Sequence, residues 1–514
     1  MPVSISKRLS SAGVWVWLTL AAAGTLGVCI LMVPPAVGLA DNGDFARVMG
    51  SAGLQYPDDG ETYEQRYFRY AHFRFAYSDY LTGGYVSSQI VLLNAAAWLG
   101  RLLDGRFFDI RVLGSVYLAL WLAALALIVR GAAAVLAGSG ERVRFAAAEA
   151  DRPDLPASAP SKRARAAALA VLSAALVPVF GDVGYLAYFN SFYGEPYAFV
   201  GVLMLAGASL ALAGAARPSG ALLALFTGAL FAAATSKIQY APLALAFLPL
   251  YARIFGLRRD FRWRVAAVAA PALVLAGAAA MVAFAPGELR HINLYQSVFY
   301  GILKDSPVLR EDLRELGIPE KYAALAGTNY FQKDTAIPQD DPQLKREVLD
   351  RLGHADVALF YLRHPDRLWK KMERAAEDGV FIRPSYLGNY AREAGHPPGA
   401  LAGMFSGWSR LKPKLPHELP WVAGFYAAYV AALAAFWLRV RTVRARMAAE
   451  TMACVALAGM ISFLVPIIGD GEADLAKHLF MFNVCSDMMV VSASAAAAWL
   501  VARLATGRRA TPGG

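Results

Sequence analysis

Residues 13–37 read GVWVWLTLAAAGTLGVCILMVPPAV and contain no charged side chain. A helix needs about 20 mostly apolar residues to cross the ~30 Å hydrocarbon core of a bilayer, so this stretch predicts a membrane span. The run exceeds the roughly 7–15 apolar residues of a cleaved signal peptide, and we therefore expect an uncleaved anchor. Nine further stretches predict spans at 112–137, 166–181, 196–216, 219–236, 240–256, 265–285, 419–438, 449–468 and 479–502.

The composition of the whole chain agrees with a polytopic membrane protein. Of its 514 residues, 57% are hydrophobic and 17% are charged, whereas soluble domains have about 45–50% apolar and about 25% charged residues. These proportions exclude disordered, fibrous and disulfide-stapled proteins. The three cysteines all lie within apolar stretches, where they are expected to be packing residues. The predicted fold class is an all-α bundle of about ten transmembrane helices.

Positive charge gathers on one side of the predicted spans. If Lys7 and Arg8 are cytoplasmic, the same side receives 22 of the 50 Lys and Arg residues but only 6 of the 39 Asp and Glu residues. By the positive-inside rule, this bias predicts that both termini lie in the cytoplasm and that the long loops face outward. It also explains the net charge of +11 without a nucleic-acid partner. We expect a multi-pass protein of a bacterial-type inner membrane, with membrane lipids around it.

The spans divide the chain into three predicted regions. Residues 1–285 form a seven-span module whose first outer loop, 38–111, carries an acidic motif. Residues 286–418 form a soluble helical outer domain, and residues 419–514 hold three spans and a cytoplasmic tail. Within this scheme, 87–103 is predicted to be an amphipathic helix on the membrane surface. The segment 139–165 is predicted to be a flexible cytoplasmic linker.

The first outer loop opens with Asp41-Asn42-Gly43-Asp44-Phe45-Ala46-Arg47. Two carboxylates three residues apart at the membrane surface could supply a general base for an acceptor hydroxyl, with Arg47 holding the carboxylate or binding a phosphate. A purely structural role is equally open, because Asp41 could cap a short helix whose first turn contains Asp44.

A second cluster lies in the short outer loop between the third and fourth spans. Its aromatic residues alternate with Asn190 and Glu195, a pattern typical of sugar sites, in which rings stack on the pyranose and polar tips bind hydroxyls. The alternative is an interfacial aromatic belt. That alternative accounts for tyrosines such as Tyr188 and Tyr193 but does not require Asn190 or Glu195.

Three cationic or potentially cationic residues stand at outer turns. Lys237, in Thr235-Ser236-Lys237-Ile238-Gln239-Tyr240, opposes the positive-inside bias and suggests a phosphate partner, although it could also snorkel to the interface. Lys477 and His478 follow an acidic turn, Gly469–Asp474, and are further phosphate candidates. Asn483 and Asp487 in the last span are spaced to bond between helices. The other histidines are scattered and show no zinc-binding pattern.

The order of these features resembles the GT-C glycosyltransferases. Asp44-Phe45-Ala46-Arg47 is similar to the first-loop motif of that superfamily, with Phe where a second acid is common. The stretches Asp41–Asp44 and Asn190–Glu195 resemble most the WsfD-type glycan-biosynthesis hexosyltransferases. Tyr361-Leu362-Arg363-His364-Pro365 is similar to a segment in the large outer loop of such enzymes.

The resemblance implies inverting transfer of a sugar, a hexose, from a polyprenyl-phosphate donor to a glycan or lipid-linked acceptor on the outer face. It implies Asp44, or Asp41, as the base. The residues expected to hold the donor phosphate are Lys237, Lys477, His478, Arg383 and Arg47. Those expected to bind the sugar or acceptor are Asn42, Tyr188, Asn190, Tyr193, Glu195, Gln239 and Tyr240. No metal is firmly implied, although the acids of 41–44 leave a divalent cation open.

Two other classes fit part of the pattern. An O-antigen-type polymerase or ligase also combines many spans with a large outer loop, but it relies on outer-loop arginines and a histidine. A lipid-sugar flippase or transporter would show internal repeats and charged residues at mid-membrane depth, where only Asp487 qualifies.

Overall fold

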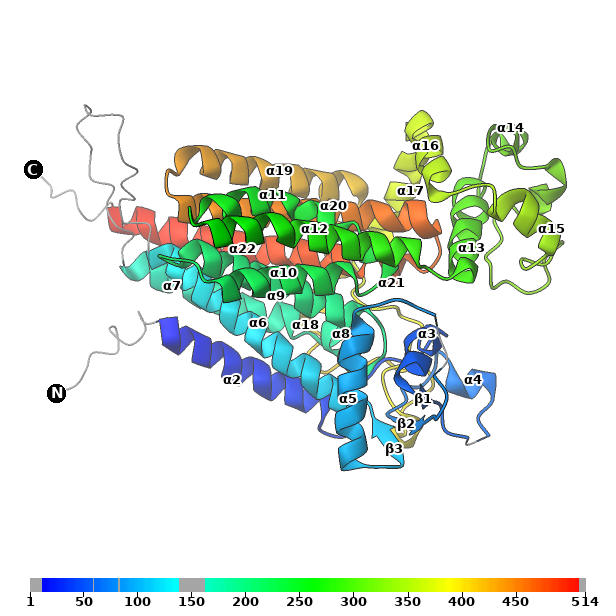
Figure 1. Cartoon of the computed structure of the whole chain (residues 1–514), viewed down its shortest axis with the longest axis horizontal. Helices are drawn as coiled ribbons and strands as arrows, with labels where there is room; N and C mark the ends of the chain where they lie inside the picture. Colours follow the sequence, from blue (N-terminus) through cyan, green and yellow to red (C-terminus); the bar gives the residue numbers. More distant parts are fainter. Residues whose placement is uncertain (1–11, 59, 82–83, 138–161, 508–514) are drawn as a thin grey trace, which may run out of the picture.

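The computed structural model describes residues 12–58, 60–81, 84–137 and 162–507, and it is mostly helical (Figure 1). Nine of its helices are long and apolar enough to cross a membrane: Ala12–Leu31, Arg111–Ala137, Lys162–Phe180, Glu195–Gly214, Ile238–Gly256, Phe261–Ala283, Leu419–Arg439, Val443–Asp470 and Phe480–Ala505. The predicted polytopic helical fold is confirmed. Lys7, Arg8 and most of the predicted linker 139–165 lie outside the described residues.

The span predicted at 219–236 is shorter than expected. It forms α10 (Gly220–Ala234), whose 15 residues rise only about 22 Å. The helix begins where Ser219 accepts a hydrogen bond from the Leu222 amide and ends at Thr235. It is packed against α9 (Glu195–Gly214) and α12 (Phe261–Ala283). The turn that follows α10 lies at the end of the bundle that carries Glu195, because Lys237 Nζ lies 2.9 Å from Glu195 Oε1.

Helix α9 lies at the centre of the bundle and contacts α6 (Arg111–Ala137), α10 and α20 (Val443–Asp470). Small residues allow the close approach to α6. A Cβ atom on Gly207 of α9 would come within 2.8 Å of Leu127 Cβ, and one on Gly131 of α6 within 2.9 Å of the Ala211 amide nitrogen. Such contacts are how helices associate in lipid, where burial of apolar surface gives no net driving force.

The first outer loop contains a small sheet that the all-helical prediction missed. Strands β1 (Leu54–Gln55), β2 (Arg74–Tyr77) and β3 (Phe107–Asp109) pair antiparallel in that order, with Leu54 opposite Tyr77 and Phe75 opposite Phe108. The strands are only two to four residues long, too short for alternation of apolar and polar residues to be recognised in the sequence.

The helix predicted at 87–103 is present as α5 (Gln89–Leu103), and it lies across the end of the spans rather than along them (Figure 1). Leu93 and Gly100 face the protein and are buried. Val91, Trp98 and Leu103 are exposed. An apolar face turned away from the protein is what a helix at a membrane surface requires.

The insertion after span Phe261–Ala283 begins with α13 (Gly287–Tyr295) and a π-helix, η5 (Gln296–Ile302). Its other main helices are α14 (Leu309–Glu315), α16 (His354–Arg363) and α17 (Pro365–Asp378). Their apolar side chains form a second core that includes Phe463, Ile467 and Phe482 from the C-terminal spans.

Residues 379–418 then turn back to the first outer loop. The backbone amides of Gly38, Ala40 and Ala71 donate to the carbonyls of Asn389 (3.0 Å), Gly388 (2.9 Å) and Tyr390 (3.0 Å). The short helix α18 (Gly407–Leu411) packs on α7 (Lys162–Phe180). The two long loops are therefore interleaved at one end of the bundle, opposite the start of α2 (Ala12–Leu31) and the end of α22 (Phe480–Gly507) (Figure 1).

Candidate active site

The carboxylate of Asp44, in the loop 38–111, contacts the segment just before the last span. Its Oδ2 accepts a 2.7 Å hydrogen bond from Lys477 Nζ, and its Oδ1 lies 2.8 Å from Arg47 Nη1. Lys477 belongs to the four-residue helix α21 (Leu475–His478), immediately before the last span, and also contacts Asp474 Oδ2 at 3.0 Å. Asn42 Nδ2 reaches the same Asp474 oxygen at 3.4 Å. Two acids and two cations from distant loops thus meet at one point.

Asp41 has a different environment from Asp44. Its Oδ1 accepts hydrogen bonds from the amides of Gly43 (2.7 Å) and Phe45 (3.1 Å), and its Oδ2 accepts one from Tyr56 Oη (2.9 Å). Gly43 has φ +99°, a conformation that favours glycine. Asp41 is fully buried, whereas 19% of the Asp44 side chain is exposed. Asp41 therefore shapes the turn, and Asp44 is the carboxylate that another molecule can reach.

The surroundings move the pKa values of these two acids in opposite directions. Burial raises the pKa of Asp41 to about 6, against the lowering effect of its hydrogen bonds from Phe45 and Tyr56. Burial acts in the same sense on Asp44, but Lys477 and Arg47 outweigh it and hold the pKa of Asp44 well below its usual range. Asp44 is consequently ionised at neutral pH. The pKa of Lys477 is raised well above its usual value, because Asp44 and Asp474 outweigh its burial.

A second polar group stands beside this pair. Lys237 Nζ pairs with the buried Glu195 Oε1 at 2.9 Å. His478 Nδ1 lies 2.6 Å from Gln239 Oε1, and its Nε2 lies 2.9 Å from Asp470 Oδ2. Burial and the nearby charge of Lys237 lower the pKa of His478 well below its usual value. A neutral imidazole supplies no positive charge, so among the candidate phosphate ligands His478 is the weakest.

Several buried polar atoms near these residues have no hydrogen-bond partner within the described part of the chain: Tyr188 Oη, Tyr240 Oη, Glu195 Oε2 and Asp474 Oδ1. Tyr188 lies within electrostatic range of Glu195, Lys477 and Asp474, and Tyr240 within range of Glu195 and Tyr188. Buried polar groups are normally paired. These four atoms therefore offer donors and acceptors to a hydroxyl-rich ligand.

Other predicted site residues hold the backbone around this cluster. Tyr193 Oη donates to the Ala40 carbonyl (2.8 Å) and accepts from the Asn42 amide (3.0 Å). Asn190 Nδ2 donates to the carbonyls of Leu31 (3.1 Å) and Val37 (2.8 Å), where α2 ends. Arg383 donates to the Asn389 side chain and to the Ala402 carbonyl. Asn190 Nδ2 and Arg383 are thus used in bonds within the protein, and neither residue pairs with Asp44 or Lys477. Asn190 Oδ1 is buried and has no hydrogen-bond partner among the described residues.

Four participants were not among the predicted site residues: Asp470, Asp474, Tyr56 and Tyr386. Asp474 precedes Lys477 by three residues, a spacing that could have indicated an ion pair. Tyr386 lies against Asp474 and Asn42, but nothing in its local sequence indicates this position. Within the described ranges, no group of three or more His, Cys, Asp and Glu side chains is arranged as metal ligands.

Asn483 and Asp487 of the last span bind a side chain from the outer insertion. Lys412 Nζ lies 2.9 Å from Asp487 Oδ1 and donates to Asn483 Oδ1. Tyr185 Oη (2.6 Å) and Trp408 Nε1 (2.7 Å) donate to Asp487 Oδ2. These contacts tie the returning segment 379–418 to the bundle. The sequence predicted that Asn483 and Asp487 bond between spans; in the structure they bond to side chains of the loops between spans instead.

Comparison with known proteins identifies the family. Residues 4–509 match the model of the YfdI N-terminal transmembrane domain, and the chain belongs to this family. No curated protein and no solved structure matches the chain.

Proposed function

We propose that this member of the YfdI N-terminal transmembrane domain family is a GT-C-type glycosyltransferase. It transfers a hexose from a polyprenyl-phosphate donor to a glycan or lipid-linked acceptor, with inversion, in cell-surface glycan biosynthesis. Membership in this family of transmembrane domains supports a glycosyl-related role at a membrane. The resemblance of the Asp41–Asp44 and Asn190–Glu195 stretches to WsfD-type hexosyltransferases supports the finer assignment.

One observation carries the proposal: a reachable, ionised carboxylate, Asp44, is held between Lys477 and Arg47 at one end of a bundle of apolar helices. A base for an acceptor hydroxyl and cations for a phosphate are the two needs of transfer from a lipid phosphate. Here they are in direct contact. The buried oxygens of Tyr188, Tyr240 and Glu195 beside them, which have no hydrogen-bond partner in the described part of the chain, suit the hydroxyl groups of a sugar.

The proposed reaction has one bond-forming and one bond-breaking event. The acceptor oxygen attacks the anomeric carbon from the side opposite the phosphate, and its proton passes to Asp44. The bond between the anomeric carbon and the phosphate oxygen breaks, and the phosphate remains on its lipid as an anion. Lys477 and Arg47 stabilise the charge that develops on that leaving oxygen.

The ion pairs of Asp44 add a consequence for the order of events. A carboxylate bound to two cations is a weak base, as its lowered pKa shows. An arriving donor phosphate competes with Asp44 for Lys477 and Arg47. Once these cations turn toward the phosphate, the pKa of Asp44 rises and the carboxylate becomes a stronger base. Donor binding would in this way activate the base.

The proposed orientation follows from the charge bias of the loops. Both termini are cytoplasmic, the membrane is a bacterial-type inner membrane, and the Asp44 cluster opens to the outer face.

The test of the function is direct. Membranes containing the protein are incubated with a panel of radiolabelled polyprenyl-phosphate hexoses, and transfer of label to glycan is followed. Transfer by the wild type and none by Asp44→Asn supports the proposal, whereas equal transfer by both removes it.

A further inference from the structure

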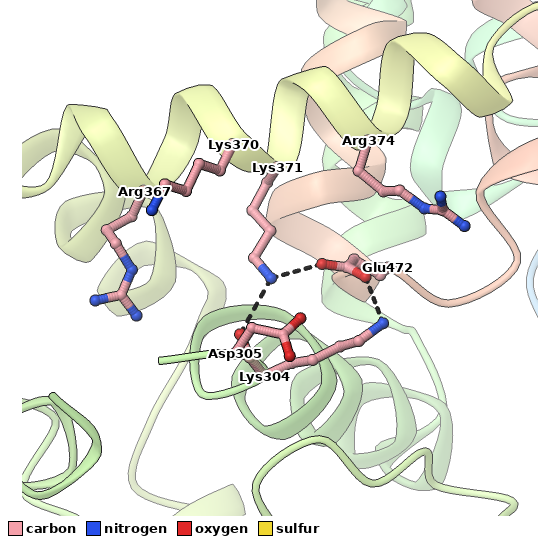
Figure 2. Close-up of a pocket in the computed structure, with 7 residues that line it drawn as sticks. All are labelled: Lys304, Asp305, Arg367, Lys370, Lys371, Arg374 and Glu472. Atoms are coloured by element: carbon pink, nitrogen blue, oxygen red, sulfur yellow. Dashed lines mark hydrogen bonds and ion pairs between the residues drawn. The ribbon is translucent and has the colours of Figure 1, made fainter. Parts of the chain in front are cut away.

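A cavity of about 370 Å³ lies in the outer region, and its lining, drawn in Figure 2, includes none of the residues that contact Asp44. Its lining holds five cationic side chains: Lys304, Arg367, Lys370, Lys371 and Arg374. Asp305 and Glu472 are its two acids, so the lining has three more cationic than acidic side chains. Arg374 is also paired with Glu377, an acid outside the lining, at 3.0 Å. Four of the cations come from successive turns of one helix, α17, and point toward the same side (Figure 2). The lysines of the lining are the groups that would attract an anion.

The carboxylate of Glu472 holds two of the cavity's lysines. Its oxygens lie 2.5 Å from Lys304 Nζ and 2.5 Å from Lys371 Nζ, as Figure 2 shows. Lys371 is 9% exposed and also reaches the Lys304 carbonyl at 3.3 Å. Arg367 is paired with Asp312 at 2.9 Å. The ammonium groups are thus positioned by the fold around a single internal carboxylate, so an incoming anion meets a formed site.

The cavity lies close to the end of a predicted membrane span. Glu472 follows the last residue of the span Val443–Asp470 by two positions, which places it within about one turn of the span's end. Helix α17 packs against α19 (Leu419–Arg439) and α20, and its Trp369 is 47% exposed. Tryptophan is enriched at the membrane–water interface. Both features favour a position of the cavity at the depth of the lipid phosphate groups.

We propose that this cavity binds a phosphate or diphosphate group carried on a lipid, as a site separate from the Asp44 cluster. Phosphate suits the lining, because lysine and arginine donate charge-assisted hydrogen bonds to its oxygens. If the proposed transferase function holds, this group belongs to the lipid carrier of the acceptor, since the donor phosphate is bound by Lys477 and Arg47. That last assignment rests on the proposed function, whereas phosphate binding in the cavity does not.

Binding, not transfer, provides the test. The full-length protein in nanodiscs is titrated with radiolabelled undecaprenyl diphosphate, with inorganic pyrophosphate as competitor. We expect Lys370→Glu and Lys371→Gln to weaken binding about tenfold or more. Lys333→Glu, at an exposed lysine of the same region outside the cavity, should bind like the wild type. Because Lys370 is exposed, its variant remains informative should Lys371→Gln fail to fold.

The remaining arms separate the sources of phosphate and the two proposals. Glu472→Gln should strengthen binding several-fold, because it releases Lys304 and Lys371. In the Asp44→Asn background, Lys370→Glu should weaken binding by the same factor as it does in the wild type, whether or not that background transfers sugar. Displacement of the lipid by an equal concentration of inorganic pyrophosphate would overturn the lipid assignment and leave a site for free anions. Equal binding by the wild type, Lys370→Glu and Glu472→Gln would overturn the site altogether.

Discussion

The ammonium of Lys477 lies 2.7 Å from Oδ2 of Asp44, although 433 residues separate them in the chain. The contact joins the turn before the last span to the loop after the first. Lys477 is almost fully buried, so the pair is little screened by solvent. It connects the proposed base to a proposed phosphate ligand, and the predictions below follow from it.

Substitution of Asp44 by Asn should abolish transfer while donor binding remains. Asn has a similar shape but accepts no proton near neutral pH, and loss of a general base costs about 100-fold to 10,000-fold. Turnover is measured with the polyprenyl-phosphate donor. Asp41→Asn is the matched control and should lose less, because Asp41 is buried and bonded to the turn. A dead Asp41→Asn with an active Asp44→Asn would transfer the role of base to Asp41.

Substitution of Lys477 by Gln should change the pH dependence of kcat/KM. Removing the cation raises the pKa of Asp44, so the carboxylate becomes protonated at a higher pH. As the pH is lowered, the variant should therefore lose activity at a higher pH than the wild type does. Loss of a charged hydrogen bond to the phosphate lowers turnover as well, by about tenfold to a hundredfold. Lys477→Arg keeps the charge and should keep the wild-type profile. If kcat/KM of Lys477→Gln and of the wild type fall in the same pH range, the effect of Lys477 on the pKa of Asp44 is contradicted.

Substitution of Lys237 by Ala should destabilise the protein in addition to lowering turnover. Glu195, only 1% exposed, would lose its partner, and breaking a buried ion pair in this way costs about 3–5 kcal/mol. Thermal unfolding in detergent measures the loss. The double variant Lys237→Ala with Glu195→Gln should recover most of the stability. If it recovers activity too, Lys237 has no role in phosphate binding beyond neutralising Glu195.

The raised pKa of Asp41 predicts how stability depends on pH. Between its ordinary value of 3.8 and about 6, the folded state binds this proton more tightly than the unfolded chain. The free energy of unfolding therefore falls as the pH rises through that window. Asp41→Asn lacks this change, so the difference in stability between the two proteins should shift by on the order of 3 kcal/mol from pH 4 to pH 7 in favour of the variant.

Thermal unfolding at several pH values checks this prediction. Asp58→Asn, at an exposed aspartate of the same loop, serves as the control and should follow the wild type throughout. A constant difference between Asp41→Asn and the wild type across the window would show that the Asp41 carboxyl titrates normally.

The topology can be checked with reporter fusions. Fusions at residues 260 and 443 should report the cytoplasm, and fusions at 60 and 350 the outer face. Residue 260 is the informative position, because it follows α10 and α11 (Leu243–Gly256), and α10 is the short helix. An outer-face signal at 260 would mean that α10 does not pass from one end of the bundle to the other.

The sequence alone determined the helical membrane fold, the position of nine spans and the helix across their ends. These follow from local composition, because a helix in lipid satisfies its own backbone hydrogen bonds and needs only a sufficiently long apolar stretch. The same reasoning found Asp41, Asp44 and Lys477 as polar residues placed just outside spans. The length of α10, 15 residues, was predicted wrongly. The apolar stretch 219–236 includes the turn at Thr235 and Ser236, so the span was predicted to be longer than the helix is.

Only the tertiary structure decided which carboxylate is reachable and what it contacts. Asp41 and Asp44 are equivalent in a sequence pattern, but Tyr56 and two backbone amides bury one of them, while Lys477 and Arg47 hold the other at the surface of the cluster. Likewise, Lys304 and Lys371 form a site only because Glu472 brings them together. Ion pairs between distant loops depend on how helices pack, and local sequence carries no record of that packing.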